Sequence, residues 1–446
     1  MTYAYQKPIN SIAKLKYSFS TEFPANNNPG KLLLTGGRLV DPQNKLDRVM
    51  DVAIQDGRVI EVSENIPANK SDRVLDCAGL VVMPGLVDMH LHLGDLFDIY
   101  ESPLFKAAVD GVTLGLSPGA GNTFMAPSLL GAEVDRGLPL NVGVYLGAAA
   151  VLSTQLDANQ LIALFRKELD DGTMSQKMTR NAITNSTAHL TVGIKDHMGH
   201  FIMSDEAIDS LFTITSKAGL IYMSHTQDPE HATRMVGLSK GRPLHLAHAT
   251  AAGCGTHADG VEGMREVLSL VDGENITAEF VSSMLLPNRG RRDGLKLAPK
   301  AQELAYRALQ DGKVKVIISD GQSGSTMKGF GNTADNLPSI FTLEKLGILP
   351  LIDAVAALTW NPVQLLSKRT GNPFFEDNLG HLGKGALANV TVADSLSQSA
   401  IYTIVNGLPV AFEGNLIREG FSAGCLVSRD GFSHRVGVGD LALYKS

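Results

Sequence analysis

The sequence predicts an α/β protein: a (β/α)8 TIM barrel with a small β-sandwich formed by the N- and C-terminal segments. Three observations support this fold class. Short apolar runs alternate with helix-like stretches through the middle of the chain, and β-rich runs with Gly turns occupy both ends. No Gly-x-Gly-x-x-Gly element follows a strand and no Walker loop is found, which argues against the alternative, a doubly wound nucleotide-binding sheet.

The chain is expected to divide into four parts. Residues 1–29 form a polar N-terminal extension, 30–84 the first part of the sandwich, 85–365 the barrel and 366–446 the second part of the sandwich. The runs 51–62 and 389–394 illustrate the two β-rich ends, and the Asp56-Gly57 pair in the first is a hairpin signal. The simplest interpretation is that both β-rich ends join in one small β-sandwich, in which they can bury their apolar faces together.

Eight candidate strands lie in the middle of the chain. Helical spacing behind a capping residue predicts helices that begin after Asp157 and Ser204. Successive strands and helices of this kind predict parallel βα units that close into a barrel. The candidate strands are 86–92, 112–117, 140–147, 190–195, 220–225, 244–249, 276–282 and 314–320.

Composition indicates a soluble protein that acts on small molecules. The 446 residues carry a mild formal charge of −7, and the segment 289–292 is the one concentrated basic run, so neither nucleic acid nor a membrane is expected as a partner. The 3 Cys residues do not suit a disulfide framework, and no signal peptide or long apolar run is found, so a cytoplasmic location is expected. Assembly into a homo-oligomer is also expected.

Polar residues end several of the predicted strands, where the active site of such a barrel forms. Residues two apart in a strand share a face, so His90 and His92 could hold one ion, and neutral imidazole suits zinc and similar metals. About 0.3 His-x-His pairs are expected from composition alone, so the pair needs support. That support comes from the other strand ends: Lys195 on strand four, His225 on strand five, His248 on strand six and Asp320 on strand eight.

Alternatives remain open at several of these positions. A structural role is the competing interpretation for His225, His248 and Asp320, although a buried Asp320 would be costly unless paired or bound to metal. Lys195 beside two cations makes sense only as an anionic carbamate or as an uncoordinated neighbour, and a lysine that points outward is the other option. Three further histidines could replace a proposed ligand: His245, His197 and His200.

The segment Val-Met-Pro-Gly-Leu-Val-Asp-Met-His-Leu-His that ends at His92, the later strand ends and the run 380–394 together resemble the amidohydrolase superfamily. The similarity covers nearly the whole chain after residue 30. Strand two and the Ser-Asp-Gly of strand eight resemble the D-aminoacylase and dihydroorotase-like branches. The Cys that D-aminoacylases use near strand two is absent, and Lys195 favours the dihydroorotase, hydantoinase and isoaspartyl-dipeptidase style of site. Asn389 departs from the family, which commonly has Asp there, but it lies on the sandwich side.

The resemblance implies a centre of one or two divalent metal ions. Zinc is the first expectation, with manganese, iron or nickel as alternatives. His90, His92 and Asp320 would hold the first ion, and His225 and His248 the second. A carbamate formed from Lys195 and carbon dioxide would bridge the two.

Such a site predicts hydrolysis of a non-peptide amide C–N bond, in a cyclic amide or an N-acyl amino acid. Metal-bound hydroxide would attack the carbonyl, and Asp320 would serve as general base and acid. The loop after strand seven carries Arg289, Arg291 and Arg292, which could bind a carboxylated substrate or form a solvated loop or an oligomer contact. The alternatives are an aminohydrolase that deaminates a heterocycle and a non-catalytic hydantoinase-like scaffold.

Overall fold

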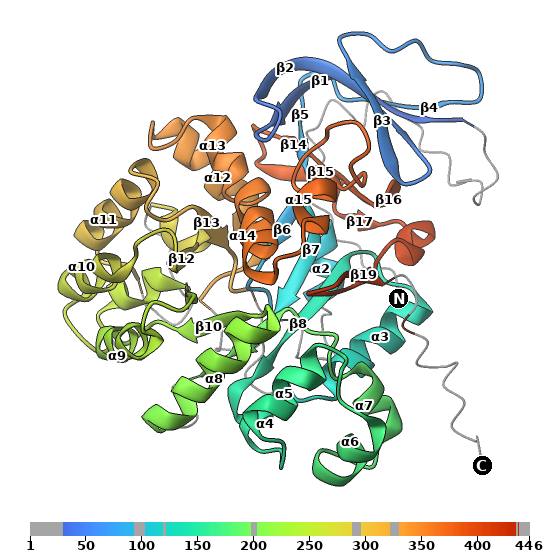
Figure 1. Cartoon of the computed structure of the whole chain (residues 1–446). Helices are drawn as coiled ribbons and strands as arrows, with labels where there is room; N and C mark the ends of the chain where they lie inside the picture. The colour runs from blue at the N-terminus through green and yellow to red at the C-terminus, as the bar shows by residue number, and fades with distance from the viewer. Residues whose placement is uncertain are drawn as a thin grey trace.

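The computed structural model describes residues 30–92, 103–118, 122–197, 203–287, 296–321, 330–433 and 436. Figure 1 shows a large body of strands and helices with a sheet of long strands at its upper end. From residue 30 onward the described chain first forms part of that sheet, then passes through the large body and returns to the sheet with strands near its C-terminal end. The path confirms that the two ends of the chain join in one body beside the barrel.

Among the described residues, eight parallel strands form the barrel, each paired with its neighbour in chain order. A parallel bridge between Leu91 and Gly321 joins the extensions of the first and last strands and brings the ring together. The predicted fold class is therefore confirmed. The strands are β6 (Leu86–Asp88), β7 (Val112–Ser117), β8 (Asn141–Gly147), β9 (Gly193–Lys195), β10 (Ile221–His225), β11 (Leu244–Ala247), β12 (Ile276–Val281) and β13 (Val316–Ile318).

Helices surround this sheet, and two of them begin at the positions that the capping residues Asp157 and Ser204 predicted. Asp157 and Gln160 form a capping box at the start of α5, and the Ser204 hydroxyl accepts from the backbone of Ala207 at the start of α8. The helices are α2 (Pro103–Val109), α3 (Ala126–Arg136), α4 (Ala148–Leu152), α5 (Ala158–Phe165), α6 (Asp171–Lys177), α7 (Ala182–Thr187), α8 (Asp205–Ala218), α9 (Pro229–Ser239), α10 (Gly260–Leu270), α11 (Pro299–Gln310), α12 (Asn336–Lys345), α13 (Leu351–Ala356), α14 (Trp360–Thr370) and α15 (Phe374–Asn378).

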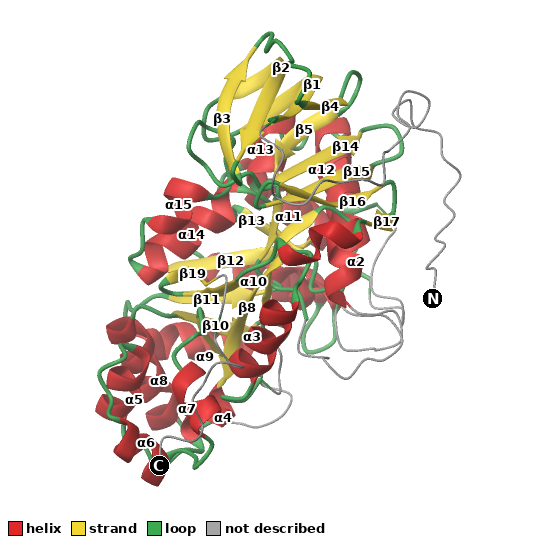
Figure 2. Cartoon of the chain, turned by 90° about the vertical axis from the view of Figure 1, so that its right-hand side faces the viewer, coloured by secondary structure: helices red, strands yellow, loops and turns green. Residues whose placement is uncertain are grey.

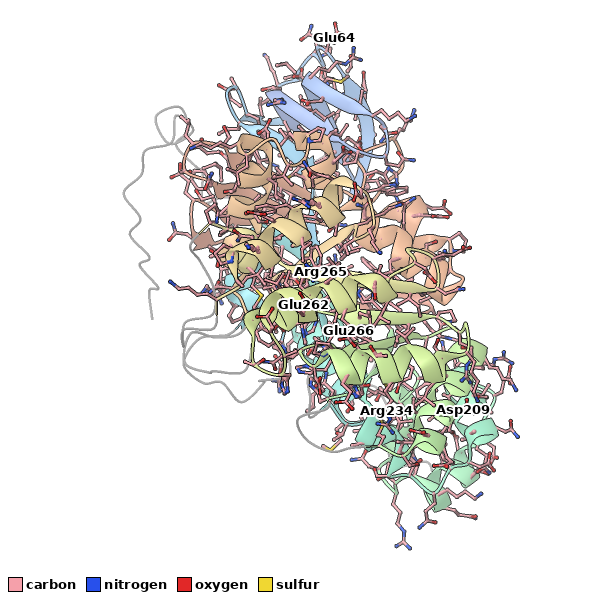
Figure 3. All side chains as sticks on the ribbon, turned by 90° about the vertical axis from the view of Figure 1, so that its left-hand side faces the viewer. Glu64, Asp209, Arg234, Glu262, Arg265 and Glu266 are labelled. Atoms are coloured by element: carbon pink, nitrogen blue, oxygen red, sulfur yellow. The ribbon has the colours of Figure 1, made fainter. Side chains whose placement is uncertain are left out.

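The outer faces of α8, α9 and α10 carry charged side chains (Figure 3), and some of these pair with residues on neighbouring elements. Arg234 contacts Asp205 at 2.5 Å, and Arg242 contacts Asp209 at 2.6 Å. Ion pairs of this exposed kind contribute little each, about 0–1 kcal/mol, so the barrel does not depend on them for its stability.

The terminal segments form one nine-stranded sheet. Its central contact is the antiparallel pair of β5, from the first segment, with β14, from the second. The hairpin between β2 and β3 turns at Asp56 and Gly57, both with positive φ, as the Asp-Gly pair predicted. The strands are β1 (Leu32–Asp41), β2 (Leu46–Gln55), β3 (Arg58–Ser63), β4 (Arg73–Asp76), β5 (Val81–Pro84), β14 (Val390–Asp394), β15 (Ser399–Val405), β16 (Leu408–Phe412) and β17 (Asn415–Leu416).

One part of the second segment departs from the expected division. The hairpin of β18 (Leu426–Ser428) and β19 (Gly431–Ser433) belongs to the barrel sheet, because β18 pairs in parallel with the first half of β8. The second half of β8 pairs with β9, so β18 takes the backbone groups that β9 leaves free. Gly143 permits this approach, since a Cβ there would lie 2.9 Å from the Val427 carbonyl oxygen. Residues 366–446 are thus not all part of the terminal sheet.

One face of the terminal sheet packs into the apolar core of the barrel, while its other face has a core of its own. Figure 2 shows the sheet resting on one end of the barrel. Met83 of β5 and Val405 of β15 belong to the same buried cluster as the barrel strands. Three asparagines also close a hydrogen-bonded ring at this joint: Asn141 donates to Asn389, Asn389 to Asn406 and Asn406 back to Asn141.

In the described part of the chain, no helix is long and apolar enough to cross a membrane.

Candidate metal centre

Three side chains from different strands meet at the carboxyl end of the barrel. His90, His248 and Asp320 are buried, and their ligand atoms all lie within 4.8 Å of one another. Asp320 Oδ1 is 2.8 Å from His90 Nε2 and 3.0 Å from His92 Nε2, so one carboxylate oxygen faces both residues of the His-x-His pair. The ends of the first, sixth and eighth barrel strands therefore form one polar cluster.

His225 extends this cluster on the side of β10. Its ring centre lies 4.6 Å from that of His248, which in turn lies 5.0 Å from His90. Asp196, the residue after Lys195, accepts a hydrogen bond from the backbone N–H of His225 at 2.9 Å. A neighbouring hydroxyl, Ser224 Oγ, also donates to Asp196. The strand-five histidine is thus fixed next to the strand-six histidine.

The Lys195 side chain points into the site. It is 1% exposed, and its Nζ lies 3.1 Å from His90 Nε2. An outward-pointing lysine would be exposed, so the structure does not support that option. Burial lowers the pKa of Lys195 to about 8, although Asp320 and Glu279 act to raise it.

The competing histidines occupy other positions. His245 lies deeper in the barrel, with Nε2 3.0 Å from Glu279 and Nδ1 2.9 Å from Thr277, so both of its nitrogens contact residues that are not among the proposed ligands. His197 Nε2 is 3.0 Å from the Pro118 carbonyl oxygen. His200 and the three arginines proposed for substrate binding lie outside the described residues: Arg289, Arg291 and Arg292.

A left-handed backbone brings two of these residues into the site. His248 has φ 38° and Asp320 has φ 47°, and each stands just beyond the end of its strand. Such conformations are uncommon for residues other than Gly and need support from their surroundings. The support is visible: His248 N donates to Glu279, and Asp320 Oδ2 accepts from Phe330 N at 2.7 Å. The predicted strands 244–249 and 314–320 end earlier than expected for this reason.

Two further buried carboxylates were not among the predicted site residues. Glu279 of β12 is 0% exposed and contacts His90 Nδ1 at 2.5 Å. Asp88 of β6, also 0% exposed, accepts from the backbone of Ser319 and from the amide of Asn336. A charged residue inside an apolar strand is the signal that could have revealed both, because its burial must be compensated.

The electrostatics of the cluster follow from burial and close charges. Burial lowers the pKa of His225 to about 3 and that of His248 well below its ordinary value, so both rings are neutral near pH 7. Burial alone would raise the pKa of Asp320, but the charge of His90 and hydrogen bonds from His90 and His92 hold it well below its usual range. Burial and Lys195 act to lower the pKa of His90, but Asp320 and Glu279 raise it above its ordinary value. His225 and His248 thus offer neutral nitrogens and Asp320 a carboxylate, the forms that bind metal.

These residues fit a divalent ion. His248 Nδ1 is buried without a hydrogen-bond partner, so one neutral imidazole nitrogen has a lone pair to offer. His90 Nε2 and Asp320 Oδ1 face each other at 2.8 Å. Two lone pairs this close repel each other unless a hydrogen or a metal cation lies between them. A set of imidazole and carboxylate donors is typical of zinc and of other divalent transition metals.

Comparison with known proteins places the chain among enzymes. A sequence model described as "Amidohydrolase family" matches residues 81–414. A dihydroorotase of Trichlorobacter lovleyi is 22% identical over 406 residues, which cover 82% of this chain and 90% of the relative. A dihydroorotase of Syntrophotalea carbinolica is 25% identical over 403 residues, covering 82% and 89%.

Solved structures show the same fold. A D-hydantoinase matches with a TM-score of 0.65 and 16% identity over 90% of this chain and 99% of its own. The L-hydantoinase (dihydropyrimidinase) of Arthrobacter aurescens matches with a TM-score of 0.62 and 18% identity over 90% and 100%. These findings confirm the expected resemblance and favour neither the deaminase nor the scaffold alternative. Because the family model spans well over half of the sequence, the chain belongs to the amidohydrolase family and is a metal-dependent hydrolase of non-peptide C–N bonds.

Proposed function

We propose that the enzyme opens the ring of a cyclic amide, at a centre built from the strand-end residues. The relatives' names support the substrate class, since dihydroorotase, hydantoinase and dihydropyrimidinase all refer to cyclic amides. An N-acyl amino acid is the second candidate. The residues proposed to hold metal are His90, His92, Lys195, His225, His248 and Asp320.

The observation that carries the proposal is the position of Asp320. One of its carboxylate oxygens faces His90 and His92, while the other is anchored by Phe330 N at 2.7 Å. The chemistry that a bound divalent metal supplies is Lewis acidity, which lowers the pKa of water and polarises a carbonyl. Asp320, kept anionic, takes the proton of the attacking water and returns it to the leaving nitrogen.

Lys195 suits a second role. Its buried Nζ, with the pKa lowered to about 8, is a neutral amine more often than an exposed lysine is. Attack of this amine on carbon dioxide forms an N–C bond and releases one proton, leaving a carbamate anion. Such an anion between two metal ions removes the repulsion that an ammonium would meet there. Zinc is the metal we propose first, and manganese, iron and nickel are the alternatives.

The direct test combines metal analysis with one substitution. The purified protein, grown with zinc or manganese, is expected to hold at least one equivalent of metal per chain. Asp320→Asn should lower kcat for ring opening by about 10²–10⁴-fold, the usual contribution of a general base, while most of the metal stays bound. Metal content is measured by elemental analysis, and turnover on dihydroorotate, hydantoin, dihydrouracil and N-acyl amino acids.

Asp311→Asn serves as the matched control, because Asp311 is an exposed residue at the end of α11. Less than one equivalent of metal in the unmodified protein would remove the basis of the proposal. Substantial activity in Asp320→Asn would refute the role of this carboxylate. Ammonia release from a heterocycle without ring opening would favour the deaminase instead.

A cytoplasmic location and homo-oligomeric assembly stay predictions from the sequence.

A further inference from the structure

Glu279 stands at the meeting point of the proposed metal site and the barrel interior. Its Oε1 lies 2.5 Å from His90 Nδ1 and 3.2 Å from the backbone nitrogen of His248, and its Oε2 lies 3.0 Å from His245 Nε2. The side chain is 0% exposed, so these groups are its described partners in place of water. A carboxylate that accepts three hydrogen bonds at full burial is compensated for its lost hydration.

A chain of hydrogen bonds links Glu279 to Arg369 on the outside of the barrel. Each donor in this chain points toward Glu279. Arg369 on α14 donates from Nη2 to Thr277 Oγ1 at 3.2 Å, and an arginine can only donate. The Thr277 hydroxyl is then free to give its single hydrogen to His245 Nδ1, which is 2.9 Å away. His245, so supplied at Nδ1, donates from Nε2 to Glu279.

This direction decides which His90 nitrogen donates to Glu279. Because Glu279 accepts from every neighbour, the His90 nitrogen that faces it, Nδ1, must carry the hydrogen. Nε2 is therefore the ring nitrogen that can offer a lone pair to a metal ion, and it lies on the side of Asp320 Oδ1 and Lys195 Nζ, at 2.8 and 3.1 Å. That side is where the ligand atoms of the cluster converge.

We propose that Glu279 is the positioning residue of the metal centre: it fixes the ring of His90 in the tautomer and orientation in which Nε2 binds metal, and it fixes the His248 backbone in the same contact. The inference rests on the proposed function, because it assigns Glu279 a role toward that metal. Glu279 does not touch the substrate or the reacting atoms in this role. His245 contributes to the same positioning, because its hydrogen bond orients the Glu279 carboxylate.

The test is the metal affinity of Glu279→Gln, which keeps the shape of the side chain but removes its charge. Loss of a partner of this kind lowers metal affinity by about 10–100-fold. The affinity of chelator-treated protein is measured by competition with a chromophoric chelator. Activity is then measured against free metal: excess metal should restore kcat of Glu279→Gln with KM within twofold of the unmodified enzyme, whereas no excess of metal should restore Asp320→Asn.

Glu303→Gln, at an exposed position of α11, is the control and should behave as the unmodified protein. Unmodified protein that binds metal together with a Glu279→Gln variant of equal affinity overturns this inference alone. Unmodified protein that binds no metal overturns the proposed function as well, so the two failures are distinguishable. Loss of activity in Glu279→Gln with full metal content, unaffected by added metal, also overturns the inference.

Should Glu279→Gln lack a cooperative thermal transition, His245→Gln is measured in the same way. The Gln amide can still donate to Glu279 but cannot take the hydrogen of Thr277 in the same geometry, so a several-fold lower affinity with rescue by excess metal is expected. Unchanged affinity overturns the inference. Loss of binding that no excess restores also overturns it, because that is how a direct ligand behaves.

Discussion

The proposed metal centre depends on single residues at the ends of the barrel strands. The conformations at His248 and Asp320 turn the chain at the points where β11 and β13 end, and each is held by a hydrogen bond from or to a neighbouring loop or strand. These residues thus occupy strained backbone positions that the surrounding structure maintains. Strain stored at polar strand ends is typical of functional sites, in agreement with the metal centre proposed there.

Lys195→Ala tests the second half of the centre at this scale. Removing the side chain should lower the metal content from two equivalents toward one and reduce kcat, because no anion remains to bridge two cations. Short carboxylic acids such as acetate should restore part of both, since they can supply the missing anion. Metal is counted by elemental analysis with and without added acid.

Lys300→Ala, an exposed position on α11, provides the matched control and should keep full metal and activity. A Lys195→Ala variant that retains two metals without any added acid would show that Lys195 is an uncoordinated neighbour. A variant with one metal that acetate does not rescue would contradict the carbamate.

The strand-end residues could be predicted from the sequence because each is a polar residue at the end of an apolar run. His90, Lys195 and Asp320 follow this pattern, and a shared face at a known edge brings them together. Glu279 could not be placed in the same way. Its partners come from strands one and six, and which interior side chains meet depends on barrel register and closure, which one sequence does not specify.

At the scale of elements, turn and cap chemistry determines where strands and helices begin. The helices after Asp157 and Ser204 start as predicted because one side-chain oxygen satisfies an otherwise free backbone N–H. The hairpin of β18 and β19 could not be predicted, since its place beside β8 depends on a gap that opens between two parallel strands. Local turn and cap residues therefore allow the ends of helices and strands to be predicted, whereas the pairing of strands far apart in the sequence cannot be predicted from them.

The loop that leads into β12 provides an element-scale prediction. Asp272 Oδ1 accepts from the backbone nitrogens of Glu274, Asn275 and Ile276 at 2.7, 2.8 and 2.8 Å. Burial alone would raise the pKa of Asp272, but these hydrogen bonds hold it below its ordinary value of 3.8. Asp272→Asn should lower the free energy of unfolding by about 0.5–1 kcal/mol at pH 7, after allowance for solvent screening.

The sign of the pH dependence follows from the lowered pKa. A carboxyl whose folded-state pKa is depressed stabilises the fold above its ordinary pKa, and this contribution is lost as the pH falls through the folded value. The difference between unmodified protein and Asp272→Asn should therefore shrink below about pH 4. Urea unfolding of both proteins at several pH values measures it, and a difference that grows toward acid would contradict the assignment.

At the scale of the whole molecule, the barrel and the terminal sheet should unfold together. One face of the sheet packs into the barrel core, the other has a core of its own, and the Asn141, Asn389 and Asn406 ring ties the sheet to β8. Trp360, the only Trp in the chain, stands at the start of α14 with its ring centre 6.0 Å from that of His381. The residue after His381, Leu382, donates to Asp41 of β1, so Trp360 reports on the joint between the two parts.

Metal removal tests this coupling, because the proposed ligands come from strands all around the barrel. A ligand that binds only the folded state stabilises it by about 2.7 kcal/mol at a free concentration of 100 times Kd. Chelator-treated protein should therefore unfold at a lower temperature, with Trp360 fluorescence and far-ultraviolet circular dichroism shifting together, as cooperative unfolding requires. Re-addition of zinc should reverse the shift. If the circular dichroism transition moved while Trp360 kept its midpoint, the sheet and its joint would unfold independently of the metal-binding barrel.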